Sequence, residues 1–86
     1  MIELEAAFGI TARLREVRDT MRGLQGESYQ SRCEPWQRVI RAEMQKSGCS
    51  ALLAASRIIK RDFEYEGIVQ AMLVSAAVEV IEADGE

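Results

Sequence analysis

Apolar positions are densest in residues 67–82, and their spacing predicts a helix over residues 64–83. Two apolar faces share this helix: one is Ile68, Met72, Ala76 and Val80, and the other is Val69, Leu73, Ala77 and Ile81. The polar positions Ser75, Glu79 and Glu82 fall on one narrow stripe. A helix that is apolar around most of its circumference is either central in a bundle or packed against a partner chain.

A second periodic segment predicts a helix over residues 2–25. Its apolar positions follow a regular 3-4-3-4-3 spacing, typical of a coiled-coil or bundle seam: Ala7, Ile10, Leu14, Val17, Met21 and Leu24. Alternation of apolar and polar residues in residues 2–8 is also compatible with a short strand, in which case the helix begins after Thr11. Arg15 and Asp19 stand four apart, as exposed ion pairs on a helix do.

Two further helices are predicted over residues 31–47 and 50–61. Ser31 and Glu34 fit a capping box at the start of the first, although Pro35 could instead kink a helix that begins near Ser28. Gly48 is expected to end that helix in a left-handed conformation, and Ser50 to cap the next one. The expected buried stripe of this last helix is Leu52, Ala55, Ile58 and Ile59.

These elements predict a single all-α domain over residues 1–86, either a small four-helix bundle or a pair of helical hairpins. A chain of 86 residues buries only about 60–65% of its unfolded surface, so we expect oligomerisation to complete the fold. The residues expected at the oligomer interface are Ile10, Leu14, Val17, Met21, Val69, Met72, Leu73, Ala76 and Val80.

Composition excludes several classes of protein. No apolar run reaches the roughly 18–20 residues that a membrane span requires. The N-terminal sequence MIELEAAF begins with acidic residues and does not fit a signal peptide, so we expect a cytoplasmic protein. The chain has no histidine, the commonest general base and zinc ligand, and its two cysteines, Cys33 and Cys49, fit small buried thiols. We therefore expect no catalytic residue, no metal and no cofactor.

Charge is distributed unevenly along the chain. Residues 13–61 hold all eleven basic side chains and five acids, a balance of +6, whereas residues 62–86 hold seven acids and no base, a balance of −7. Such a division favours contacts between the two halves, either within one chain or head to tail between chains.

The basic side chains of the central helices form the candidate binding site. It comprises Trp36, Arg38, Arg41, Arg57, Lys60 and Arg61. Arginine forks onto phosphate or carboxylate, so the site fits an acidic protein surface or a phosphate-bearing ligand such as a nucleotide. The alternative is a solvated face that the acidic C-terminal third partly neutralises.

Residues 40–59 also have the outline of a DNA-binding helix-turn-helix. The pattern fits poorly, since Glu43 and Arg57 occupy positions that are normally apolar. The second helix of this outline also begins with apolar residues, whereas base reading uses polar side chains near the helix start.

These observations favour a non-enzymatic, oligomeric helical protein that binds a macromolecule and modulates or inhibits it. The alternatives are a DNA-binding regulator and a protein that sequesters a phosphate-bearing ligand. In overall character the chain resembles the small accessory proteins of temperate phages and mobile elements, which are short, helical and without catalytic residues. That resemblance implies no role for any single residue.

Overall fold

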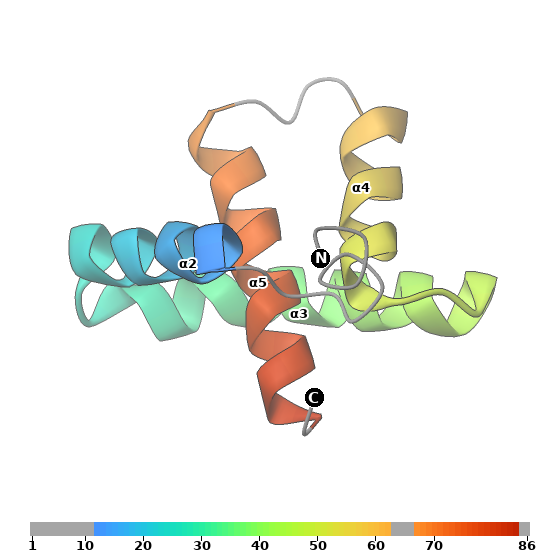
Figure 1. Ribbon diagram of the computed structural model, residues 1–86, viewed down its shortest axis with the longest axis horizontal. Helices are drawn as coiled ribbons and strands as arrows, with labels where there is room; N and C mark the ends of the chain where they lie inside the picture. Colours follow the sequence, from blue (N-terminus) through green and yellow to red (C-terminus); the bar gives the residue numbers. More distant parts are fainter. Residues whose placement is uncertain (1–11, 63–66, 85–86) are drawn as a thin grey trace.

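The computed structural model describes residues 12–62 and 67–84. These residues form four α-helices and no strand: α2 (Ala12–Gln25), α3 (Ser28–Ser47), α4 (Ala51–Arg61) and α5 (Ile68–Ala83) (Figure 1). The all-α prediction is confirmed. The choice between helix and strand in residues 2–8, the position of Ile10 and the predicted start of the last helix at residue 64 lie outside the described residues.

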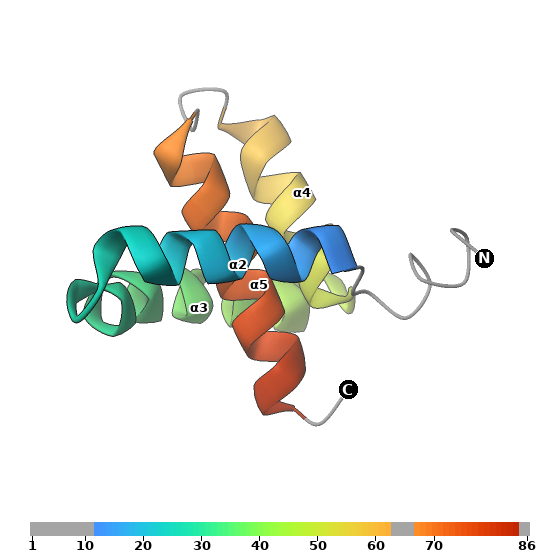
Figure 2. The ribbon, with the colours of Figure 1, turned by 60° about the vertical axis from the view of Figure 1, so that its left-hand side comes forward.

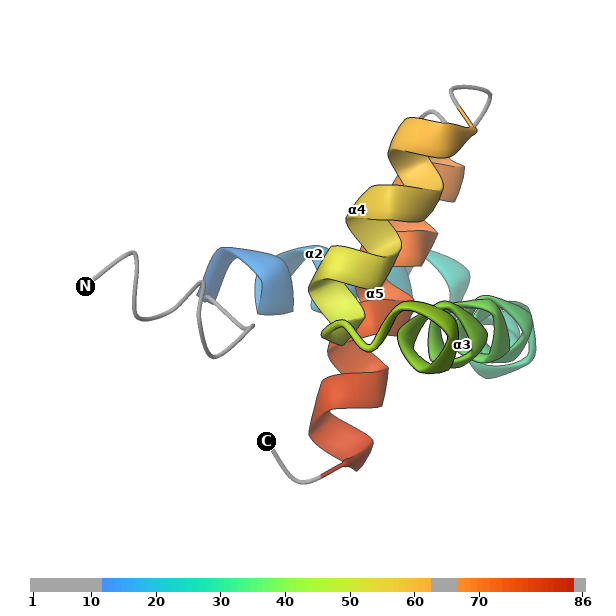
Figure 3. The same cartoon turned by 90° about the vertical axis from the view of Figure 1, so that its right-hand side faces the viewer.

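The central element is α5. It lies between α2 and α3, which cross it on opposite sides (Figures 2 and 3). The shorter α4 packs beside the N-terminal half of α5 (Figure 1). Of the two arrangements that the sequence allowed for this helix, the structure has the central one. Neither within residues 12–62 nor within 67–84 is there a helix with the length and apolar content needed to cross a membrane.

The core forms where the other three helices meet α5. Leu73, Ala76, Ala77 and Val80 of α5 have no exposed surface, and the other buried apolar residues of this cluster are Met21, Tyr29, Cys33, Ile40, Ala51, Ala54, Ala55, Ile58 and Met72. Many of these side chains are small, which lets the helix backbones approach closely. Ser75 is also fully buried, and its hydroxyl donates to the carbonyl oxygen of Ala71 at 2.8 Å, so it adds no unpaired polar group to the core.

The buried face of α4 differs slightly from the predicted one. Ala55 and Ile58 are buried as expected, but Ala51 and Ala54 accompany them, whereas Leu52 and Ile59 are only partly buried. Small residues occupy the face that meets α5, and the larger side chains lie at its edge.

The start of α3 corrects the predicted capping box. The helix begins at Ser28, and Ser31 lies inside it with its hydroxyl donating to the Ser28 carbonyl at 3.2 Å. Gly26 makes the preceding turn with a φ of 55°, and its carbonyl accepts from the Tyr29 amide. Tyr29 is buried in the core, so packing of the first turn outweighs the local capping signal. Pro35 consequently lies within the helix, as the alternative interpretation allowed.

The predicted junction between α3 and α4 is confirmed. Gly48 has a φ of 63°, and its amide donates to the Met44 carbonyl at 2.7 Å. The Ser50 hydroxyl accepts from the Leu53 amide at 3.2 Å, which satisfies one free donor at the start of α4.

We expect Leu73→Ala to lower the free energy of unfolding by about 2–5 kcal/mol, because it leaves a cavity where α2, α3 and α4 enclose α5. Leu53→Ala is the matched control, since Leu53 is 47% exposed and should lose less than about 1 kcal/mol. Urea denaturation at one fixed protein concentration measures both. Equal losses would contradict the central position of α5.

Candidate interaction surfaces

The acidic side chains of α5 face three arginines of α2. This group, here named the ion cluster, consists of Arg15, Arg18, Arg22, Glu79 and Glu82. The Arg18 side chain is only 7% exposed, and its two terminal nitrogens donate to the two carboxylate oxygens of Glu82. Such a paired fork is among the strongest charge-assisted contacts in proteins. The ion cluster therefore fixes α2 against the C-terminal half of α5.

Hydrogen bonding controls the protonation of these groups. The hydrogen bond from Arg18 lowers the pKa of the Glu82 carboxyl below its ordinary value of 4.5, although partial burial acts in the opposite direction. The same bond raises the pKa of Arg18. Both groups are therefore charged at neutral pH, and the pair holds over the whole physiological range.

Tyr29 connects α3 to the same cluster. Its hydroxyl donates to Glu79 at 2.7 Å, and the Arg22 guanidinium lies over its ring at 5.6 Å from the centroid. Burial and the hydrogen bond to Glu79 both raise the pKa of the Tyr29 hydroxyl, so it remains a proton donor. Glu79 thus joins α2 and α3 to the central helix.

Two residues of the predicted binding site, Arg41 and Arg61, also form ion pairs with acids. Arg41 of α3 lies 3.1 Å from Asp84, just after α5, and Arg61 of α4 lies 3.2 Å from Glu43 of α3. Burial opposes the ionisation of Glu43, but hydrogen bonds from Arg61 and Ser47 outweigh it and lower its pKa. Of the acids in residues 62–86, Glu79, Glu82 and Asp84 thus pair with arginines of the same chain. The expected pair between Arg15 and Asp19 is replaced by contacts of Arg15 with Glu82 and of Arg18 with Asp19.

The remaining predicted site residues keep their positive charge exposed. Arg38, Arg57 and Lys60 are exposed and have no ion pair with any residue of 12–62 or 67–84, and the same holds for Lys46. Trp36 is half-buried at the edge of the core. Arg38, Lys46, Arg57 and Lys60 are therefore the basic side chains of α3 and α4 whose charge no ion pair with the described residues offsets, apart from Arg32, which contacts Gln25.

Helical spacing divides the predicted site into two parts. Trp36, Val39, Glu43 and Lys46 repeat at three and four residues, so they share one flank of α3. The pair between Glu43 and Arg61 brings α4 to this flank, and Arg57 lies one turn before Arg61. We name this area the α3–α4 surface; it comprises Trp36, Val39, Lys46, Arg57, Lys60 and Arg61. Arg38 and Arg41 lie on another flank of α3. This flank faces the end of α5, because Arg41 pairs with Asp84 there.

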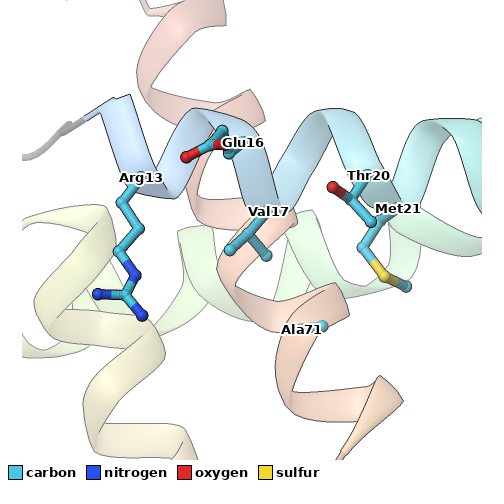
Figure 4. A pocket seen from close by; sticks show the side chains of 6 residues that line it. All are labelled: Arg13, Glu16, Val17, Thr20, Met21 and Ala71. Atoms are coloured by element: carbon cyan, nitrogen blue, oxygen red, sulfur yellow. The ribbon is translucent and has the colours of Figure 1, made fainter.

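A hollow of about 290 Å³ lies between α2 and α5 (Figure 4). By helical spacing, its α2 residues lie on the opposite side of that helix from Arg15, Arg18 and Arg22. Its lining residues are Arg13, Glu16, Val17, Thr20, Met21 and Ala71. Arg13 and Val17 extend from α2 on the side where Ala71 of α5 lies (Figure 4). The spacing along the sequence predicts Val17 and Met21 as apolar seam positions, but it gives no sign of a hollow beside them.

Most residues predicted for an oligomer interface lie inside the single chain. Met21, Met72, Leu73, Ala76 and Val80 are at most 5% exposed, because α5 is enclosed by helices of its own chain. These five positions are therefore covered within the chain itself. Half-buried positions remain at Leu14, Val17 and Val69.

Among the described residues, no three acidic or cysteine side chains gather as a metal site would require. Cys33 is a buried free thiol that accepts from the Gln37 amide at 3.3 Å, and Cys49 is a half-buried free thiol. No family model, curated protein or solved structure matches this chain.

We expect Glu82→Gln to reduce stability at neutral pH by about 1–3 kcal/mol, since it removes the charge of the carboxylate that accepts from both terminal nitrogens of the buried Arg18 and leaves only the bond from its Nε to Asp19. A carboxyl with a lowered pKa stabilises the fold above its ordinary value of 4.5, and this contribution is lost as the pH falls through the lowered pKa. The difference between wild type and variant should therefore shrink between about pH 7 and about pH 3.

Glu27→Gln is the control for this experiment, because Glu27 is exposed and forms no ion pair with the described residues. Urea denaturation across the pH range gives the two differences. A gap between wild type and Glu82→Gln that stays constant on acidification would show that the Glu82 charge does not stabilise the fold.

Proposed function

We propose that this protein is a non-enzymatic binding protein that occupies an acidic surface of another protein through its α3–α4 surface, and thereby modulates or inhibits it. One observation carries the proposal. Arg57, Lys60 and Lys46 are exposed and form no ion pair with the described residues, while Glu79 and Glu82 of α5 and Asp84 just after it pair with arginines of α2 and α3.

Charge and apolar surface occur together in this area. Val39 is 41% exposed and Trp36 is half-buried, so apolar contacts accompany the cations. Tryptophan and arginine are the side chains most enriched among residues that dominate binding energy. Complementary charge around such anchors accelerates association and selects an acidic partner.

The alternatives fit this area less well. At the start of α4, the Ser50 hydroxyl is engaged with the Leu53 amide, Ala51 is buried and the first exposed side chain within the helix is the apolar Leu53, which is a poor start for reading a base edge. A phosphate-bearing small molecule needs a concave site, but the hollow described above is lined by residues of α2 and α5 and by none of the cations of α4.

Two further features belong to the proposal. We place the protein in the cytoplasm, because Cys33 and Cys49 are free thiols as expected in a reducing compartment. We also propose self-association, because Leu24 and Ile68 remain 75% and 70% exposed in a chain that is small for a stable monomer. The overall resemblance to accessory proteins of phages and mobile elements agrees with a role as a modulator.

We expect Arg57→Glu to weaken binding to an acidic protein surface at least tenfold, or about 1.4 kcal/mol, by reversing the charge at the centre of the α3–α4 surface. A polyglutamate peptide serves as the acidic probe, and random-sequence duplex DNA as the comparison. Arg32→Glu is the matched control: it makes the same charge change at an exposed arginine of α3 whose contact is with Gln25 of α2. Fluorescence anisotropy at several salt concentrations measures binding.

Circular dichroism should be unchanged in both variants, because exposed charges contribute little to stability. Equal loss of binding in the two variants would indicate attraction to overall charge and contradict a defined surface. Tighter binding to DNA than to polyglutamate, with a steep salt dependence that Arg57→Glu reduces, would replace the proposal by a nucleic-acid interface.

A further inference from the structure

The corner between α2 and the first turns of α5 combines a hollow with exposed apolar side chains. Ala71 forms the α5 side of the hollow, and Ile68, one turn earlier on the same face, is 70% exposed. Leu24 follows Thr20 by one turn along α2 and is 75% exposed. A hydrogen bond from Gln25 to the Met72 sulfur at 3.0 Å holds the two helices together at this corner.

The crossing of the two helices explains why the hollow exists. One flank of α2 carries Arg15, Arg18 and Arg22, which pair with the C-terminal half of α5. The other flank faces the N-terminal half of α5, where Ala71 offers only a methyl group to fill the space. Short side chains on one helix thus leave Val17 and Met21 beside an open hollow.

The size of the hollow and its surroundings point to a protein occupant. Its volume of about 290 Å³ is just below the range of about 300–1,000 Å³ that is usual for small-molecule sites. An apolar floor beside two exposed apolar side chains is typical of a surface that accepts a side chain from another protein.

The charges on the rim are complementary to those of a second copy of this chain. Arg13 and Glu16 lie one turn apart on α2, have opposite charges and form no ion pair with the described residues. Twofold symmetry brings the same patch of two subunits together, so such an interface must be self-complementary. This corner meets that condition: it has an apolar projection, an apolar hollow and one charge of each sign.

We propose that the chain forms a symmetric dimer in which Ile68 of each copy enters the α2–α5 hollow of the other, with Arg13 of each copy paired to Glu16 of its partner. This inference rests on the proposed self-association and names its surface. It does not depend on the acidic partner, since the α3–α4 surface lies on other helices and stays free.

Charge reversal on the rim tests the pairing directly. Arg13→Glu gives a rim with two negative charges, and Glu16→Arg gives a rim with two positive charges. Each variant alone should weaken dimerisation at least tenfold, because like charges then meet across the axis. An equal mixture of the two should restore a one-to-one heterodimer, because every rim charge again faces its opposite. A purely structural role of these exposed residues predicts no recovery on mixing.

Ile68→Asp tests the apolar contact, and Leu53→Asp is its control at an exposed leucine of α4. Sedimentation equilibrium from about 5 to about 500 μM, a range that brackets a micromolar Kd, gives the mass of each protein. We expect wild type and Leu53→Asp to reach twice the chain mass of 9.6 kDa, and Ile68→Asp to stay at 9.6 kDa with an unchanged circular dichroism spectrum.

Each result has one meaning. A wild-type protein that stays at 9.6 kDa throughout overturns both self-association and this interface. Dimers that persist in Ile68→Asp, or a mixture of rim variants that fails to associate, leave self-association standing but place its surface elsewhere. Neither outcome affects the polyglutamate experiment, which reports on α3 and α4.

Discussion

A helix that is apolar around most of its circumference must be covered on several sides, and α5 imposes this requirement on the whole domain. The hairpin of α2 and α3 meets it by placing α5 between its two helices, and α4 covers the remaining N-terminal half. Side chains such as Leu73, Ala76 and Val80 are then fully buried within one chain. The arrangement uses small residues where helices cross, because close-packed backbones leave no room for larger ones.

The same crossing determines the electrostatics of the surface. Glu79 and Glu82 lie on the polar stripe of α5. α2 crosses α5 there, and its Arg18 and Arg22 pair with these two acids. Since these two acids are paired with arginines of α2, they do not neutralise the cations of α3 and α4. A chain with a net charge of −3 can therefore present a positive area, because the position of its charges decides the local field more than their sum.

The α3–α4 surface and the α2–α5 hollow both result from the way the other helices pack around α5, and they lie on different parts of the chain. Its C-terminal half pairs with one flank of α2, and its N-terminal half leaves a hollow beside the other flank. The cations of the α3–α4 surface lie on helices that do not line this hollow. A dimer formed through α2 and α5 would consequently carry two copies of the basic surface, and two linked sites bind a repeated or paired acidic target more tightly than one.

The sequence by itself determined the helical class, the junction at Gly48 and Ser50, and the apolar character of α5, because these depend on residues that are three or four positions apart. It did not reveal the bond between Arg18 and Glu82, which joins residues 64 positions apart. It also placed Met72 and Leu73 between chains, since periodicity shows that a face is buried but not what buries it. It likewise did not show that Tyr29 is buried in the first turn of α3, which begins at Ser28, before the capping signal at Ser31. Only the crossing of α2 and α3 over α5 decided which charges are paired and where a hollow remains, because these depend on how distant segments meet.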